Sequence, residues 1–340
     1  MICRHRMSQF QNFLSGSVLG IKEPKLKSKA GGTATMDGRR AENQNQHNRN
    51  RGNLSSEKYL GVTLLNGLIT VVEVTGGVMS GSLSLLSDAA HNLGDTVSIL
   101  FSYIAWKIAG KEKDVRRTYG YKRAEIIAAF VNASVLLAIS LFLVFAAVRR
   151  FRNPKTIDSG LMIGVAAFGL MANFISMRLL EKESHGNMNV RSSYLHLLGD
   201  TVSSFGVLGG GIAIRIWGVF WIDPFVTVLI SLYIMRESWM IVKNSVGILM
   251  QSSADLDYRA LQREIEVIPE VRNIHHVHTW MANEETVYFE AHIEVEDCLV
   301  SSACVVSDKI EAILKGRYGI SHVTLQFETG RCSEKSFFKK

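Results

Sequence analysis

The chain has 340 residues, of which 47% are hydrophobic and only 20% are charged. It is too apolar for an ordinary soluble protein and too polar to lie entirely in a membrane, and its 4 cysteines are too few for a disulfide scaffold. A net charge of +7 would suit a nucleic-acid-binding protein. The basic residues, however, gather in the N-terminal tail and in short loops beside apolar runs, which indicates membrane topology and no nucleic-acid partner.

Residues 1–56 are predicted to form a disordered cytosolic tail. The segment is rich in Asn and Gln between residues 43 and 53. No apolar stretch of signal-peptide length follows Arg4 and Arg6, so a cleavable signal is not expected.

Residues 57–251 are predicted to form a transmembrane domain of six helices. A bilayer core needs about 20 mostly apolar residues per helix. Ile126–Val148 contains 23 residues and Gly160–Met177 contains 18, both without a charge. The other four spans are more polar and are expected within Tyr59–Ser87, about Ser84–Gly110, Tyr194–Trp217 and Ile222–Met250.

Lys and Arg side chains set the expected orientation, because they favour the cytoplasmic side. The loop Lys111–Arg123 holds 6 of them, and the loop that begins at Arg178 adds more. The basic residues between 149 and 155 favour the opposite orientation. The majority places both termini in the cytoplasm.

Residues 252–330 are predicted to form a small cytosolic α+β domain with the order αββαβ, a ferredoxin-like arrangement. Apolar residues recur at helical spacing in Asp255–Ile268 and again between Val305 and Leu314, and they alternate in Thr286–Val295 and Val323–Phe327. A strand near Ile274–Trp280 completes the sheet. Residues 331–340 are expected to form a C-terminal tail.

Two of the predicted spans contain the same pair of metal-binding residue types. His91 and Asp95 lie four residues apart in one span, and His196 and Asp200 repeat this spacing in another. Residues four apart share a helix face, so each pair offers an imidazole and a carboxylate in one direction. Together they predict a four-ligand set for a tetrahedral divalent ion such as Zn²⁺.

Other polar residues of the spans leave alternatives open. Asp88 supports the ligands or packs helices together. Glu73 is more typical of a cavity-lining or structural acid than of a ligand. Asn132 and Asn173 are more often partners in hydrogen bonds between helices than metal ligands.

The segment from Ser87 to Asp95, the segment Tyr119–Glu125, the His196/Asp200 pair and Asp223-Pro224 together resemble the cation diffusion facilitator family, in its zinc-transporter-like branch. The resemblance covers about residues 58–329. It implies a homodimer in the membrane that exports divalent cations, most simply Zn²⁺, from the cytoplasm in exchange for protons by alternating access. Cd²⁺ or Co²⁺ are further substrates that the branch transports.

The resemblance also assigns residues. It places the transport site at His91, Asp95, His196 and Asp200. In the cytosolic domain it implies a second metal site, which serves sensing or dimer stabilisation, with the ligands His275, His292, His322 and Glu328.

Two positions depart from the family pattern. Some members bind a metal in the loop between the second and third spans, but here the matching positions are Arg117 and Tyr121, so no metal is expected there. Cys304 stands where some members have a His, and its alternative is a small buried residue.

Three other classes of protein would use the same ligands differently: a membrane metal sensor, a cation channel, or an intramembrane metalloenzyme. The last lacks the His-Glu-x-x-His motif, and the chain also lacks a nucleotide-binding loop, so an ion gradient is the expected energy source. A short, His-poor loop between the fourth and fifth spans favours a bacterial inner membrane.

Overall fold

The structure is a computed structural model that describes residues 61–184, 188–332 and 336–338. The predicted N-terminal tail lies outside these residues. The chain divides into two compact units, one formed by residues up to Ile104 with Val131–Ile241, the other by Ala105–Phe130 with Val242–Lys340. The loop after the second predicted span therefore groups with the C-terminal part of the chain.

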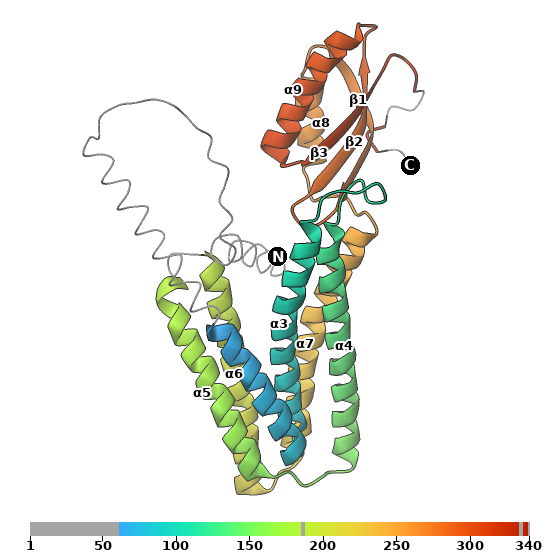
Figure 1. The fold of residues 1–340 in the computed structure, drawn as a ribbon. Coiled ribbons are helices and arrows are strands. Elements are labelled where there is room, and N and C mark those ends of the chain that lie inside the picture. The colour runs from blue at the N-terminus through green and yellow to red at the C-terminus, as the bar shows by residue number, and fades with distance from the viewer. Residues whose placement is uncertain (1–60, 185–187, 333–335, 339–340) are drawn as a thin grey trace, which may run out of the picture. The chain divides into compact units, whose positions relative to one another are not determined.

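Among the described residues, five helices are long and apolar enough to cross a membrane. The first, Gly61–Ser80, carries no label in Figure 1 and is drawn in blue. The others are α4 (Arg123–Arg152), α5 (Ser159–Ser184), α6 (Met188–Trp217) and α7 (Ile222–Leu249). Each lies where the apolar runs predicted a span.

The remaining predicted span is the helix α3, Leu83–Ala109, which has 27 residues. At 1.5 Å per residue it is about 40 Å long, enough to cross a bilayer. Its buried residues include the polar side chains of Ser84, Ser87, Asp88 and Asn92, and His91 lies beside them. This polar face brings the candidate site into the bundle.

The start of α3 is held by a single buried carboxylate from α7. Asp223 accepts hydrogen bonds from the Ser82 hydroxyl at 2.6 Å, the Leu83 amide at 3.0 Å and the Ser84 amide at 3.1 Å. Arg150 of α4 lies 3.3 Å from the same carboxylate. Free amides at a helix start carry partial positive charge, so a buried acid caps α3 and joins it to two other helices.

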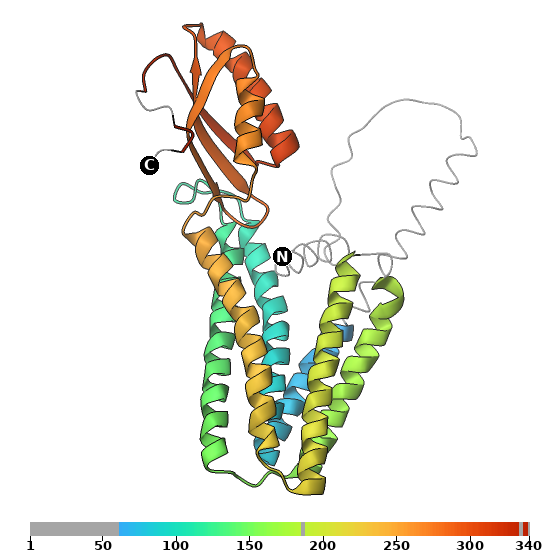
Figure 2. The same cartoon turned by 180° about the vertical axis from the view of Figure 1, so that it is seen from behind.

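The C-terminal part contains the predicted elements in the predicted order: α8 (Tyr258–Glu266), β1 (Val271–Met281), β2 (Val287–Val295), α9 (Val300–Tyr318) and β3 (His322–Glu328). The strands form one sheet in the order β1-β2-β3. β1 and β2 are antiparallel, whereas β2 and β3 are parallel. Both helices lie on the same face of the sheet (Figure 2).

Alternation along the strands separates a core face from a polar face. Phe289, Ala291 and Ile293 of β2 pack in the core with Leu261 of α8 and Ile310 of α9. Because successive side chains of a strand point to opposite faces, the intervening positions of β2 and β3 point away from this core. Histidines and acids of this polar face supply the second candidate site.

The loop between α3 and α4 packs on the end of the sheet within the second compact unit. Tyr119 lies edge-on to Tyr288 with ring centroids 5.1 Å apart, and to His322 at 6.3 Å. Lys122 donates to the Thr286 hydroxyl at 2.8 Å. The segment Tyr119–Glu125, which carried part of the family resemblance, therefore packs against the sheet within this unit.

We expect Asp223→Ala to destabilise the helical bundle. The change removes the cap of α3 and leaves the partly buried Arg150 without its carboxylate, which costs about 3 kcal/mol or more. The measurement is the midpoint of thermal unfolding of the purified protein in detergent.

Asp158→Ala is the matched control, because the exposed Asp158 caps the start of α5 through the amides of Gly160 and Leu161. Its loss should cost only about 1 kcal/mol. Equal shifts of the unfolding midpoint in the two variants would contradict the role of Asp223 as a buried residue that connects α7 to α3 and α4.

Candidate metal centres

The two His–Asp pairs meet inside the helical bundle, and each histidine contacts the aspartate of the other helix. His91 Nε2 on α3 lies 3.0 Å from Asp200 Oδ1 on α6. His196 Nε2 on α6 lies 2.7 Å from Asp95 Oδ2 on α3. Within each pair the closest nitrogen–oxygen distances are longer, at 3.9 Å for α3 and 3.4 Å for α6. The four side chains therefore form one cluster and not two separate pairs.

This intramembrane cluster has the donor atoms and the spacing of a metal site. One nitrogen or oxygen from each residue lies within 4.8 Å of the other three. Zn–N and Zn–O bonds of about 2.0–2.2 Å put tetrahedral donors about 3.3–3.6 Å apart. The cross-helix distances are slightly shorter and one within-helix distance is slightly longer, so small side-chain shifts suffice. The Asp200 side chain is only 2% exposed, whereas those of His91 and His196 are 15% and 20% exposed.

Asp88, one turn before His91, joins α3 to α6. Its two carboxylate oxygens accept hydrogen bonds from Ser203 at 2.6 Å and Ser204 at 3.0 Å. Its ligand atoms do not belong to the four-residue group. Of the two alternatives that the sequence left open, the contacts favour helix packing beside the cluster.

The two asparagines also contact neighbouring helices, as the sequence predicted. Asn132 of α4 donates to the Ser98 hydroxyl of α3 at 2.6 Å, and Asn173 of α5 donates to Ser204 at 3.2 Å. One bond joins α4 to α3, and the other joins α5 to α6.

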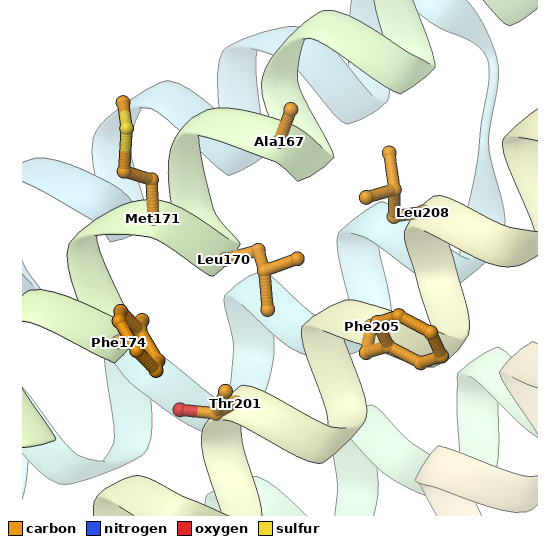
Figure 3. A pocket seen from close by; sticks show the side chains of 7 residues that line it. All are labelled: Ala167, Leu170, Met171, Phe174, Thr201, Phe205 and Leu208. Carbon is orange, nitrogen blue, oxygen red and sulfur yellow. The ribbon is translucent and has the colours of Figure 1, made fainter.

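An apolar pocket between α5 and α6 lies apart from this chemistry (Figure 3). Its lining includes Leu170, Phe174 and Phe205, and the one hydroxyl shown, that of Thr201, donates to the Leu197 carbonyl in its own helix. The pocket therefore offers no set of metal donors.

A second cluster lies on the polar face of the sheet. His275 Nε2 on β1 lies 2.9 Å from Glu328 Oε1, at the end of β3. His292 Nδ1 on β2 lies 3.3 Å from the other oxygen of Glu328, and Cys332 Sγ lies 3.8 Å from the same nitrogen. The four residues each offer a ligand atom within 4.8 Å of the others. We refer to them as the sheet cluster.

The surroundings of Glu328 stabilise the ionised form of its carboxyl group. Burial alone would raise its pKa, but hydrogen bonds from Cys332 and His275 and the charge of His292 outweigh burial and lower the pKa below its usual value. An ionised carboxylate beside two imidazoles and a thiol is a suitable set of donors for Zn²⁺.

His322, the remaining residue that the resemblance assigned to this site, is not brought to the sheet cluster within the chain. It pairs with Tyr288 at the start of β3, whereas Glu328 pairs with Glu294 at the other end. Six residues of strand separate the two by about 20 Å, so a shared face does not place them together. His322 instead lies among the rings of Tyr119 and Tyr288.

Cys332 is the member of the cluster that sequence reasoning missed. It follows the last strand by four residues, in a segment without hydrophobic periodicity. Its closeness to a strand that ends in an acid is the only signal that could have suggested it. Cys304, which the family pattern had singled out, is exposed and is not in the group.

A bulge in β1 turns a further histidine toward this face. His276 has a φ of 54°, a left-handed conformation that costs energy for a residue other than Gly. Its ring centroid lies 4.5 Å from that of His292 and 5.0 Å from that of His278. The strained backbone therefore adds imidazoles to the edge of the sheet cluster.

A helical bundle with a buried His–Asp cluster, followed by a small domain with a second cluster, defines a multi-pass membrane protein equipped for metal cations. The chain belongs to the cation efflux family, the zinc-type cation diffusion facilitators. Residues 60–250 match the family's description "Cation efflux transmembrane domain", and residues 254–330 match "Cation efflux protein, cytoplasmic domain". This is a family of metal transporters and not of enzymes.

Several bacterial relatives cover most of the chain. The zinc transporter ZitB of Escherichia coli is 39% identical over 265 residues, which is 77% of this chain and 84% of that protein. The metal cation efflux system protein CzcD of Cupriavidus metallidurans is 36% identical over 82% of this chain and 89% of its own. The "Cadmium, cobalt and zinc/H(+)-K(+) antiporter" of Bacillus subtilis is 32% identical over 83% of this chain and 92% of its own length.

We expect Cys332→Ser to remove the thiolate from the sheet cluster. Co²⁺ bound by a thiolate gives an intense near-ultraviolet charge-transfer band, which nitrogen and oxygen ligands alone do not give. The measurement is the absorption spectrum of the full chain in detergent titrated with Co²⁺. The band should be present in the native protein and absent in the variant.

Cys304→Ser is the matched control and should keep the band, because Cys304 lies outside the cluster. His322→Ala should also keep it. A band that survives in Cys332→Ser, or that disappears in His322→Ala, would contradict the ligand set that the geometry indicates.

Proposed function

We propose that the protein exports divalent metal cations, Zn²⁺ in particular, from the cytoplasm in exchange for protons. The observation that carries the proposal is the crossed pairing of His91 with Asp200 and of His196 with Asp95. Ionisable groups inside a membrane are costly and are kept for function. A set of two imidazoles and two carboxylates from two helices suits a tetrahedral divalent ion.

The same four residues supply a reason for proton coupling. An imidazole binds a metal only in its neutral form, so the arrival of the ion releases any proton that the ring carries. With an ordinary pKa of about 6.5, histidine exchanges protons near neutral pH. Metal and proton then compete for the same nitrogens, and a proton entering from the far side favours release of the ion.

Alternating access follows from the placement of the ligands on two helices. Each pair belongs to one helix, and the side chains of His91 and His196 contact the aspartates of the facing helix. A small movement of α3 relative to α6 therefore opens the four-ligand set without breaking either pair. We propose this movement as the step that exposes the ion to one side at a time.

The names of the relatives support the substrate class. Zinc appears in the names of the E. coli and B. subtilis proteins, and the latter name adds cadmium, cobalt, protons and potassium. We propose Zn²⁺ as the principal substrate of this chain, with Cd²⁺ and Co²⁺ as further substrates.

We propose that the sheet cluster binds Zn²⁺ in the cytoplasm and that the protein acts as a homodimer. In this arrangement the cluster senses metal or stabilises the dimer and lies outside the transport path. The topology that the basic loops favour, with both termini in the cytoplasm of a bacterial inner membrane, agrees with a cytosolic metal site.

Replacing either aspartate of the intramembrane cluster should abolish transport. Asp95→Ala and Asp200→Ala each remove one of four donors and leave the facing imidazole without its partner. Zinc uptake into proteoliposomes with an imposed pH gradient should fall by about 100-fold or more. The measurement uses a zinc-sensitive dye and a pH-sensitive dye inside the vesicles.

Glu237→Gln serves as the control, since Glu237 on α7 contacts only its neighbour Arg236 in the bonds observed. It should transport normally. Undiminished flux in either aspartate variant would refute the assignment. Binding without uptake by the native protein would favour a metal sensor, and uptake without proton movement would favour a channel.

A further inference from the structure

The first helix carries a carboxyl group that the proposed mechanism does not use. The Glu73 side chain is fully buried. Its Oε2 accepts one hydrogen bond, from the Asn92 amide at 2.8 Å, and its Oε1 has no hydrogen-bond partner. Among the described residues, no Lys, Arg or His lies within ion-pair distance of it. The group is therefore a buried acid without a positive partner.

The carboxyl group of Glu73 lies against two neighbouring helices. A Cβ atom at Gly169 of α5 would lie 2.4 Å from Glu73 Oε1, so the glycine leaves the space that this oxygen occupies. Asn92 of α3 contacts the other oxygen. The group therefore lies among three helices: its own, α3 and α5.

Hydrogen bonds and neighbouring turns of the same helices connect this acid to the residues beside the metal cluster. Asn92 lies one helical turn after Asp88 on α3, and Asp88 accepts the Ser204 hydroxyl at 3.0 Å. Ser204 accepts a bond from Asn173, which lies one turn after Gly169 on α5. Gly169 in turn lies against Glu73 Oε1. These connections include α3, which carries His91, and α6, which carries Asp200.

We propose that Glu73 binds one of the protons that the transporter exchanges for its metal ion. An ionised carboxylate in an apolar interior is too costly to persist without a positive partner, and the free Oε1 is where a proton can sit. This inference rests on the proposed function, because it adds a proton site to the same exchange.

The neighbouring charges explain how metal and proton exclude each other. The titratable groups that act on Glu73 are Asp88 and His91 of α3 and Asp200 of α6. A divalent ion at the intramembrane cluster adds positive charge next to this group and favours the ionised carboxylate. The bond between the proton and Oε1 breaks, the electron pair stays on Oε1, and the proton leaves to the side from which the metal entered.

The return step restores the starting state. When the ion has left to the opposite side, Glu73 is again a buried acid without a positive partner and takes up a proton from that side. Glu73 is not itself a metal ligand, since it does not belong to the four-residue group. A variant can therefore lose the proton and still bind the metal.

The test uses Glu73→Gln in the full chain. Glutamine keeps the oxygen that accepts the Asn92 bond but cannot ionise. On addition of Zn²⁺ to weakly buffered protein in detergent, a pH-sensitive dye should report about one fewer proton per metal ion than in the native protein. Zinc binding should persist. The logarithm of the zinc-binding constant should depend on pH with a slope that is smaller than that of the native protein by about one.

A second measurement starts from the native protein. Addition of Zn²⁺ to the native protein should remove the infrared carbonyl band of a protonated carboxyl group. Gly169→Ala, which pushes on Oε1, should shift this band, and Gly164→Ala should not, because the space at Gly164 is open.

The outcomes separate this inference from the proposed function. If Glu73→Gln releases as many protons as the native protein, or if the native protein loses no protonated carboxyl band, the inference is overturned while proton-coupled export stands. If the native protein binds zinc without releasing any proton, the proposed exchange itself fails.

Discussion

The burial of carboxylates and imidazoles within the helical bundle is the constraint on which the rest of the structure depends. Water cannot solvate these groups in a membrane, so each needs a partner from another helix. The crossed contacts between α3 and α6 satisfy this need with side chains that are themselves ligands. In the proposed function, a metal ion takes the place of these contacts and is bound by the same four side chains.

Four acids in and beside the intramembrane cluster fall into two groups by their partners. Asp95 and Asp200 contact histidines, whereas Asp88 contacts serine hydroxyls and Glu73 contacts an amide. Neutral donors such as serine and asparagine hold a carboxyl group in place without adding charge. Because these donors come from α3 and α6, they fix the helices beside the cluster while the ligands stay available to the ion.

The sequence predicted most of the fold because its main signals are local. Apolar runs located the membrane helices, alternation located the strands, and four-residue spacing put His91 and Asp95 on one helix face. The family resemblance assigned His322 to the second site, and local patterns could not correct it, because alternation identifies the face of a strand but not the distance along it. The pairing of β2 with β3 sets that distance, and it brings Cys332, which follows the sheet, to a position that no periodicity marks.

The two clusters differ in one donor, and this difference suits different tasks. The intramembrane cluster has two nitrogens and two oxygens, whereas the sheet cluster replaces one oxygen by sulfur. A thiolate is a softer ligand that strengthens binding of Zn²⁺. The proposed transport site has to release its ion at every cycle, and a set of donors without a thiolate suits that task. The proposed cytosolic site retains its ion, and the thiolate of Cys332 would slow its release.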